Sequence, residues 1–84
     1  METKSTADYF LDITTLVCPM TFVRAKLAVE RLSAGQTLEI RLNPGEPLAN
    51  VPRTLTEHGH LVLSVVPETL DAPNGPHRLM VRRA

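Results

Sequence analysis

The sequence predicts an α+β fold, a two-layer α/β sandwich in the order strand, helix, strand, helix, strand, strand (βαβαββ). Its four-stranded mixed sheet is expected to carry two helices on one face. Three of the four segments that read as strands alternate polar and apolar residues, which indicates a sheet with one solvated face. Two segments with helical spacing separate the first three strands. A chain of 84 residues has room for one small domain.

The N-terminal part divides into a polar segment and a first strand. Residues 1–8 are polar, and we expect a flexible segment there, followed by a single domain over residues 9–84. Residues 9–13 predict a short strand, with Tyr9, Leu11 and Ile13 on one face and Phe10 and Asp12 on the other.

The first helix is predicted to begin at Pro19, where the pattern changes from strand to helix. A proline with its fixed φ suits the first position of a helix, where no backbone N–H is required. Gly35, after Ser33 and Ala34, is a natural C-terminal stop. The apolar residues at helical spacing, expected to face the core, are Phe22, Ala25, Val29 and Leu32.

The second helix is predicted to begin near Asn50, which is an acceptable N-cap residue. Pro52 then lies in the first turn, where proline is tolerated. The helix is expected to run to His58 and to stop at Gly59.

Three further strands complete the sheet. Residues 37–42 alternate most clearly, with Leu38, Ile40 and Leu42 directed inward. Residues 61–66 form a more fully apolar strand, and residues 78–82 form the last one, with Leu79 and Val81 inward. Residues 71–76 are rich in turn-forming residues and predict a loop.

The composition excludes several classes of protein. Nine basic and nine acidic residues give a net charge of zero, and aromatic residues are scarce, so nucleic-acid binding is not favoured. One cysteine cannot form an internal disulfide, which favours a reducing compartment. Residues 1–6 lack the apolar stretch of a signal peptide and no segment could span a membrane, so the cytoplasm is expected. Nothing in the sequence requires a cofactor, and a monomer is expected.

Cys18 is the main candidate for chemistry. It is the only cysteine and stands directly before Pro19, so it is the predicted N-cap of the first helix. Free N–H groups and the positive end of the helix dipole then favour its thiolate. A thiolate can attack sulfur, carry sulfur as a persulfide or bind a soft metal. The alternative is that Cys18 is a small buried hydrophobic residue.

Three other kinds of thiol site find no support in the residues. Neither a cysteine protease nor a zinc site is indicated, because nothing places a histidine beside Cys18 and no metal-ligand spacing is present. A Cys-x-x-Cys pair is absent, which excludes an internal dithiol cycle. The three histidines, expected to be surface residues, are His58, His60 and His77.

Several residues near Cys18 are candidates for supporting roles. Arg24 and Lys26 lie in the same predicted helix, either as a solvated face or as a basic surface that attracts acidic partners. Met20 lies off the apolar stripe and suits an exposed docking patch around the thiol. The terminal arginines Arg78, Arg82 and Arg83 could contact phosphate.

The run Cys18-Pro19-Met20-Thr21 resembles the Cys-Pro-x-Pro signature of the TusA-type, or SirA-like, sulfur-carrier family. Further similarities follow in the order of the family's motifs. They are Asn43-Pro44 for its Asp-Pro turn, Asn50-Val51-Pro52 for its Asp-Ile-Pro before the second helix, and Gly59-His60 for its Gly-His before the third strand. The similarity covers the chain from Tyr9 onward. Cys-Pro alone is a weak signal, whereas the ordered series is specific.

This resemblance implies a βαβαββ sandwich and a cytoplasmic sulfur carrier. Cys18 would accept sulfane sulfur as a persulfide from a cysteine desulfurase or a rhodanese-type donor and pass it to an acceptor protein. The protein would be a sulfurtransferase in this relay sense. Pro19 and the helix N-terminus would stabilise the sulfur, and Arg24 and Lys26 would dock partners. The alternatives are a non-catalytic regulatory or interaction module of the same fold and, third, a nucleic-acid-binding domain.

The sequence departs from the family pattern at several positions. Thr21 replaces the second proline of the signature. Threonine has the backbone N–H that proline lacks, and this N–H would give the Cys18 sulfur one more hydrogen-bond donor. The loss of the proline could instead loosen the first turn of the helix. Asn43 and Asn50 stand where the family often has aspartate. The usual glycine of the first loop is absent, with Thr15 in its neighbourhood.

Overall fold

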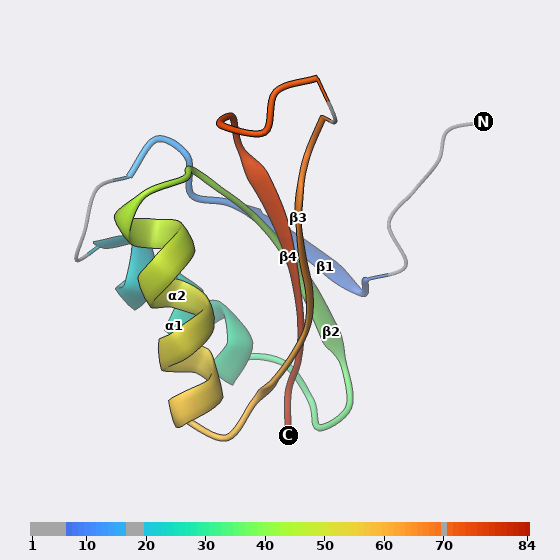
Figure 1. Ribbon diagram of the computed structural model, residues 1–84. Helices are drawn as coiled ribbons and strands as arrows, with labels where there is room; N and C mark the ends of the chain where they lie inside the picture. The colour runs from blue at the N-terminus through green and yellow to red at the C-terminus, as the bar shows by residue number, and fades with distance from the viewer. Residues whose placement is uncertain (1–6, 17–19, 70) are drawn as a thin grey trace.

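The computed structural model describes residues 7–16, 20–69 and 71–84 and has the predicted order of elements (Figure 1). The four-stranded mixed sheet carries both helices on one face, so the predicted fold class is confirmed. The elements are β1 (Tyr9–Asp12), α1 (Met20–Glu30), β2 (Thr37–Leu42), α2 (Glu46–Glu57), β3 (Leu61–Pro67) and β4 (His77–Arg82).

The strand order in the sheet is β1-β2-β4-β3. β1 runs parallel to β2, with Leu11 opposite Ile40. β4 runs antiparallel to both of its neighbours, β2 and β3. Leu79 of β4 lies opposite Ile40 of β2 and opposite Val65 of β3. The last strand of the chain therefore lies inside the sheet. β1 and β3 form its two edges, and β3 shifts register between Val62 and Ser64.

The core lies between the helices and the inner face of the sheet. Alternate residues of β2 and β4 are buried, as the polarity pattern predicts for strands covered on one face. Ala25, Val29 and Leu32 meet this layer as predicted, whereas Phe22 is only half-buried. The buried hydrophobic residues are Ile13, Ala25, Val29, Leu32, Leu38, Ile40, Leu42, Val51, Leu55, Leu79 and Val81.

The outer face of the sheet carries a network of ion pairs. Arg78 bridges Glu39 at 3.3 Å and Glu68 at 2.8 Å, and Arg41 contacts Glu68 at 3.0 Å. The hydrogen bond from Arg78, followed by that from Arg41, lowers the pKa of Glu68. The Arg78 guanidinium also lies 5.0 Å from the centre of the Phe10 ring. Two arginines thus hold the solvated face of three strands together.

Helix α1 ends at Glu30, before the predicted stop at Gly35. The Arg83 side chain donates hydrogen bonds to the backbone carbonyls of Glu30 and Leu32 and so satisfies groups that a helix end leaves unpaired. Gly35, with φ +87°, belongs instead to the turn before β2, where its N–H donates to the Arg83 carbonyl at 2.9 Å. The prediction missed this end because Arg83 is distant in sequence.

Helix α2 begins at Glu46, four residues before the predicted N-cap. Gly45, with φ +93°, is the N-cap, and Pro47 occupies the first turn, where its missing N–H is not needed. Asn50 therefore lies inside the helix, and so does Pro52. The predicted end is confirmed, since the helix closes at His58 before Gly59, whose φ is +90°.

The prediction that all three histidines are surface residues is wrong for His77, which is 8 % exposed. It begins β4 on the inner face of the sheet, and its Nδ1 lies 2.9 Å from the Gly75 carbonyl oxygen. This local partner satisfies one ring nitrogen and so reduces the free-energy cost of burying a polar side chain. His58 is exposed and His60 is half-buried.

Candidate functional site

The candidate site begins at the C-terminal end of β1, in the loop that leads toward α1. Asp12 Oδ1 accepts hydrogen bonds from the Thr14 N–H at 2.9 Å and the Thr14 hydroxyl at 2.6 Å. Such a turn, closed by an aspartate on the residue two positions later, ends a strand locally. The two bonds from Thr14, followed by the Arg41 charge, lower the pKa of Asp12.

The end of β2 holds this loop from the neighbouring strand. Arg41 donates to the Thr14 hydroxyl at 3.1 Å and lies 3.3 Å from Asp12 Oδ2. The Asn43 side-chain amide donates to the Thr14 carbonyl at 2.8 Å. The chain therefore leaves β1 in a defined direction. Our sequence interpretation missed this support, although the Asp-x-Thr pattern after a strand is a signal that could have found it.

Cys18 and Pro19, the predicted centre of the site, lie outside the described residues. The description stops at Leu16, whose N–H donates to the Ile13 carbonyl at 3.1 Å, and resumes with Met20 at the start of α1. The loop held by Asp12 and Arg41 thus precedes Cys18, and α1 follows it.

Met20 and Thr21 open α1 in different environments. Met20 is 45 % exposed, which agrees with its expected place in an exposed patch, whereas Thr21 is fully buried. A buried threonine in the first turn is packed by the core, so its replacement affects folding as well as the start of the helix. Phe22 stacks on His58 at the end of α2, with ring centroids 6.3 Å apart.

The two basic residues predicted to dock partners differ in their surroundings. Lys26 forms an ion pair with Glu30 at 3.3 Å, one helical turn later. Arg24 is exposed and has no carboxylate partner in residues 7–16, 20–69 and 71–84. Of these two residues, Arg24 therefore offers the more available charge.

The remaining candidates are dispersed over the molecule. Arg78 and Arg83 are engaged by protein groups, as described above, and Arg82 is the exposed one of the three terminal arginines. Within the described part of the chain, no three His, Cys, Asp or Glu side chains gather in a way that could hold a metal ion. None of the described helices has the length and apolar character required to cross a membrane.

Comparison with known proteins gives consistent similarities. Residues 9–83 match the family described as sulfurtransferase TusA. A protein of Archaeoglobus fulgidus named "Putative sulfur carrier protein" is 39% identical over 59 residues, which cover 70% of this chain and 67% of that protein. The crystal structure of a SirA-like protein from Desulfitobacterium hafniense superposes with a TM-score of 0.72. That comparison covers 88% of this chain and 95% of the other, and at 20% identity it shows the shared fold alone.

Proposed function

Because the chain belongs to the TusA sulfurtransferase family, we propose that it carries sulfane sulfur as a persulfide on Cys18 and relays it between proteins. The observation that carries the proposal is that the only cysteine of the chain stands in the family's Cys-Pro motif, two residues before the first described residue of α1. With a single cysteine, all sulfur bound through a thiol must reside on Cys18.

The proposed transfer exchanges one sulfur–sulfur bond for another. The Cys18 thiolate attacks the outer sulfur of a persulfide on the donor protein, and a new S–S bond forms as the donor's S–S bond breaks. The donor cysteine leaves as a thiolate, which takes up the proton given up by Cys18. The same exchange in the opposite sense passes the sulfur to an acceptor protein. The two thiols exchange one sulfane sulfur, so no external oxidant or reductant is needed.

The described residues support this proposal through the frame on either side of Cys18. The loop before it is tied to β2 through Thr14, and α1 after it presents an exposed Met20. Such a frame suits a thiol that must be presented to other proteins. A cysteine desulfurase or a rhodanese-type protein is the proposed donor class, and the cytoplasm is the proposed location.

Intact-mass measurement tests the function. After incubation with a cysteine desulfurase and L-cysteine, or with a rhodanese and thiosulfate, the protein should gain about 32 Da, the mass of one sulfur, and lose it on reduction. Cys18→Ser should gain nothing, because the chain has no other cysteine. No gain with several competent donors would refute persulfide carriage and favour the interaction module.

A further inference from the structure

Helix α1 presents an exposed stripe in which apolar and basic side chains alternate. Met20, Arg24, Leu27 and Arg31 follow one another at intervals of four, three and four residues, which places them on one face of the helix and of the turn that continues it. Leu27 is 48 % exposed, close to the value for Met20, and both arginines are exposed. The stripe starts two residues after Cys18.

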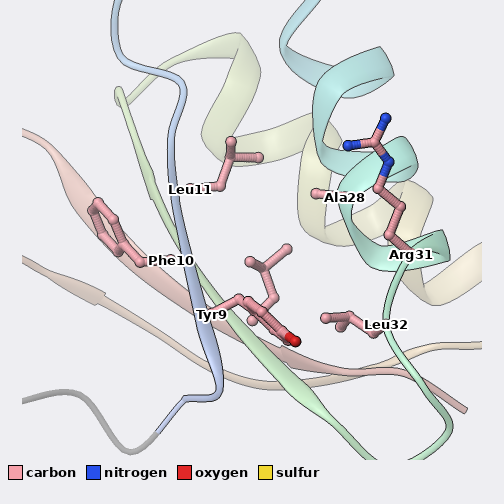
Figure 2. A pocket seen from close by; sticks show the side chains of 7 residues that line it. Tyr9, Phe10, Leu11, Ala28, Arg31 and Leu32 are labelled. Carbon is pink, nitrogen blue, oxygen red and sulfur yellow. The ribbon is translucent and has the colours of Figure 1, made fainter.

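The stripe borders a groove between α1 and the edge strand β1. One hollow, of about 340 Å³, lies where side chains of the two elements face each other (Figure 2). In that view Ala28 and Leu32 point from α1 and the turn after it toward β1, Tyr9 lies beside Leu32, and Phe10 lies on the other side of β1. A second hollow, of about 190 Å³, shares Leu11, Ala28 and Arg31 with the first. The shared residues join the hollows into one groove, which is completed by Tyr9, Leu38, Arg24, Leu27 and Leu32.

The groove combines an apolar floor with positive charge. Arg24 and Arg31 both line it, and neither has a carboxylate partner within the described residues. Lys26, in contrast, is paired with Glu30 on another face of the helix. An occupant with apolar side chains and carboxylates would match this surface in both respects.

We propose that this groove docks an acidic, apolar segment of a protein that exchanges sulfur with Cys18, an inference that rests on the proposed function. Arg31 lies seven positions after Arg24, a rise of about 10 Å along a helix. Two carboxylates three residues apart in an extended segment of polyproline-II type lie on the same side of the chain and span a similar distance, about 9 Å. Apolar side chains between them would cover Leu27 and Ala28. A segment lying along the stripe would end at Met20, which follows Cys18 by two residues in the sequence.

The shape of the groove favours a protein segment over a small molecule. The hollow is open, and the exposed apolar side chains extend from Tyr9 at one end to Met20 at the other. A small carboxylate would fill one hollow and leave Met20, which lines neither hollow, uncovered. β1 is also an edge strand, so an extended chain can approach its outer side.

Binding of a synthetic peptide tests the groove without any sulfur chemistry. The probe is an acetylated, amidated peptide with two glutamates flanking two leucines, titrated into ¹⁵N-labelled protein. We expect saturable shifts of the Leu11, Leu27 and Ala28 amides. The affinity should fall about tenfold when the glutamates are replaced by glutamines or in Arg24→Gln/Arg31→Gln. Arg53→Gln, which changes an exposed arginine of α2 outside the groove, is the matched control.

Several results would overturn the proposal. They are absence of shifts at these amides, equal binding of the glutamine peptide, and an equal loss in Arg53→Gln. Equal competition by free acetate would also overturn it, because the site would then bind a small anion.

Sulfur loading separates failure of the groove from failure of the function. Inorganic polysulfide needs no docking, so its rate of loading Cys18 serves as the reference. In Arg24→Gln/Arg31→Gln, the ratio of the second-order rate with a protein donor or acceptor to the polysulfide rate should fall about tenfold. If Cys18 loads and this ratio is unchanged with both donor and acceptor, the docking proposal is wrong. If Cys18 accepts no sulfur even from polysulfide, the sulfur-carrier function fails, and the peptide titration still decides whether the groove binds acidic segments.

Discussion

The guanidinium of Arg83 donates a hydrogen bond of 2.8 Å to the backbone carbonyl of Glu30, the last residue of α1. A second bond from the same nitrogen reaches the Leu32 carbonyl. Arg83, the residue that follows the last strand, thus stabilises the end of α1, the helix whose first described residue is Met20. A cation at the C-terminal end of a helix also interacts favourably with the helix dipole.

Replacing Arg83 should therefore destabilise the protein. We expect Arg83→Ala to lower the free energy of unfolding by about 1–2 kcal/mol, because carbonyls at the helix end lose a charged donor. Urea denaturation measures this change. Arg82→Ala, at the exposed neighbouring position, should change stability by no more than about 0.5 kcal/mol. Equal effects of the two substitutions would contradict the assignment.

Glu68 should make stability depend on pH in the acidic range. Its pKa is lowered by Arg78 and Arg41, so between the lowered pKa and the ordinary glutamate pKa the folded state binds fewer protons than the unfolded state. The resulting stabilisation is present above the ordinary glutamate pKa and is lost as the pH falls through the lowered value. Glu68→Gln should destabilise the protein at pH 7 and approach the wild type in stability below about pH 4.

Urea denaturation at several pH values measures this convergence. Glu57→Gln is the matched control, because Glu57 is exposed and forms no ion pair within the described residues. A constant difference between Glu68→Gln and wild type from pH 7 to pH 3 would show that the loss has another origin.

Leu55 should be essential to the core, since it is fully buried on α2. Leu55→Ala should lower the free energy of unfolding by about 2–5 kcal/mol through the lost burial and the cavity left behind. Leu61→Ala, on the edge strand where the side chain is 54 % exposed, should cost less than about 1 kcal/mol. Thermal and urea unfolding of both variants provide the comparison, and a similar cost at the two sites would be inconsistent with this core.

Thr21 provides a test of how the thiolate is stabilised. If its N–H donates to sulfur, Thr21→Pro should raise the Cys18 thiol pKa by about one unit, the equivalent of one hydrogen bond to an anion. Thr21→Val retains the N–H and should leave that pKa unchanged. The thiolate absorbance, followed against pH in variants shown to be folded by circular dichroism, gives both values. A lower thiol pKa in the proline variant would refute the donor hypothesis.

Local patterns predicted the elements whose signals lie within a few residues. The alternation in residues 37–42 located β2 and its buried residues, because a strand covered on one face requires that period. The Gly59 stop was also correct, since a left-handed residue ends a helix locally. The start of α2 was wrong because Asn50 and Gly45 both suit an N-cap, and Pro47 favours the earlier one.

The sequence by itself determined the order of elements, the inward residues of β2 and β4, and the single thiol of the chain, all of which follow from periodicity and composition. Only the tertiary structure decided the features that depend on contacts between residues distant in the sequence. Insertion of β4 beside β2 leaves the apolar β3 at an edge of the sheet. His77 is buried because it lies in β4, inside the sheet. Arg41 and Asn43 reach the Thr14 loop, and β1 meets α1 in a groove, because the fold brings these segments together.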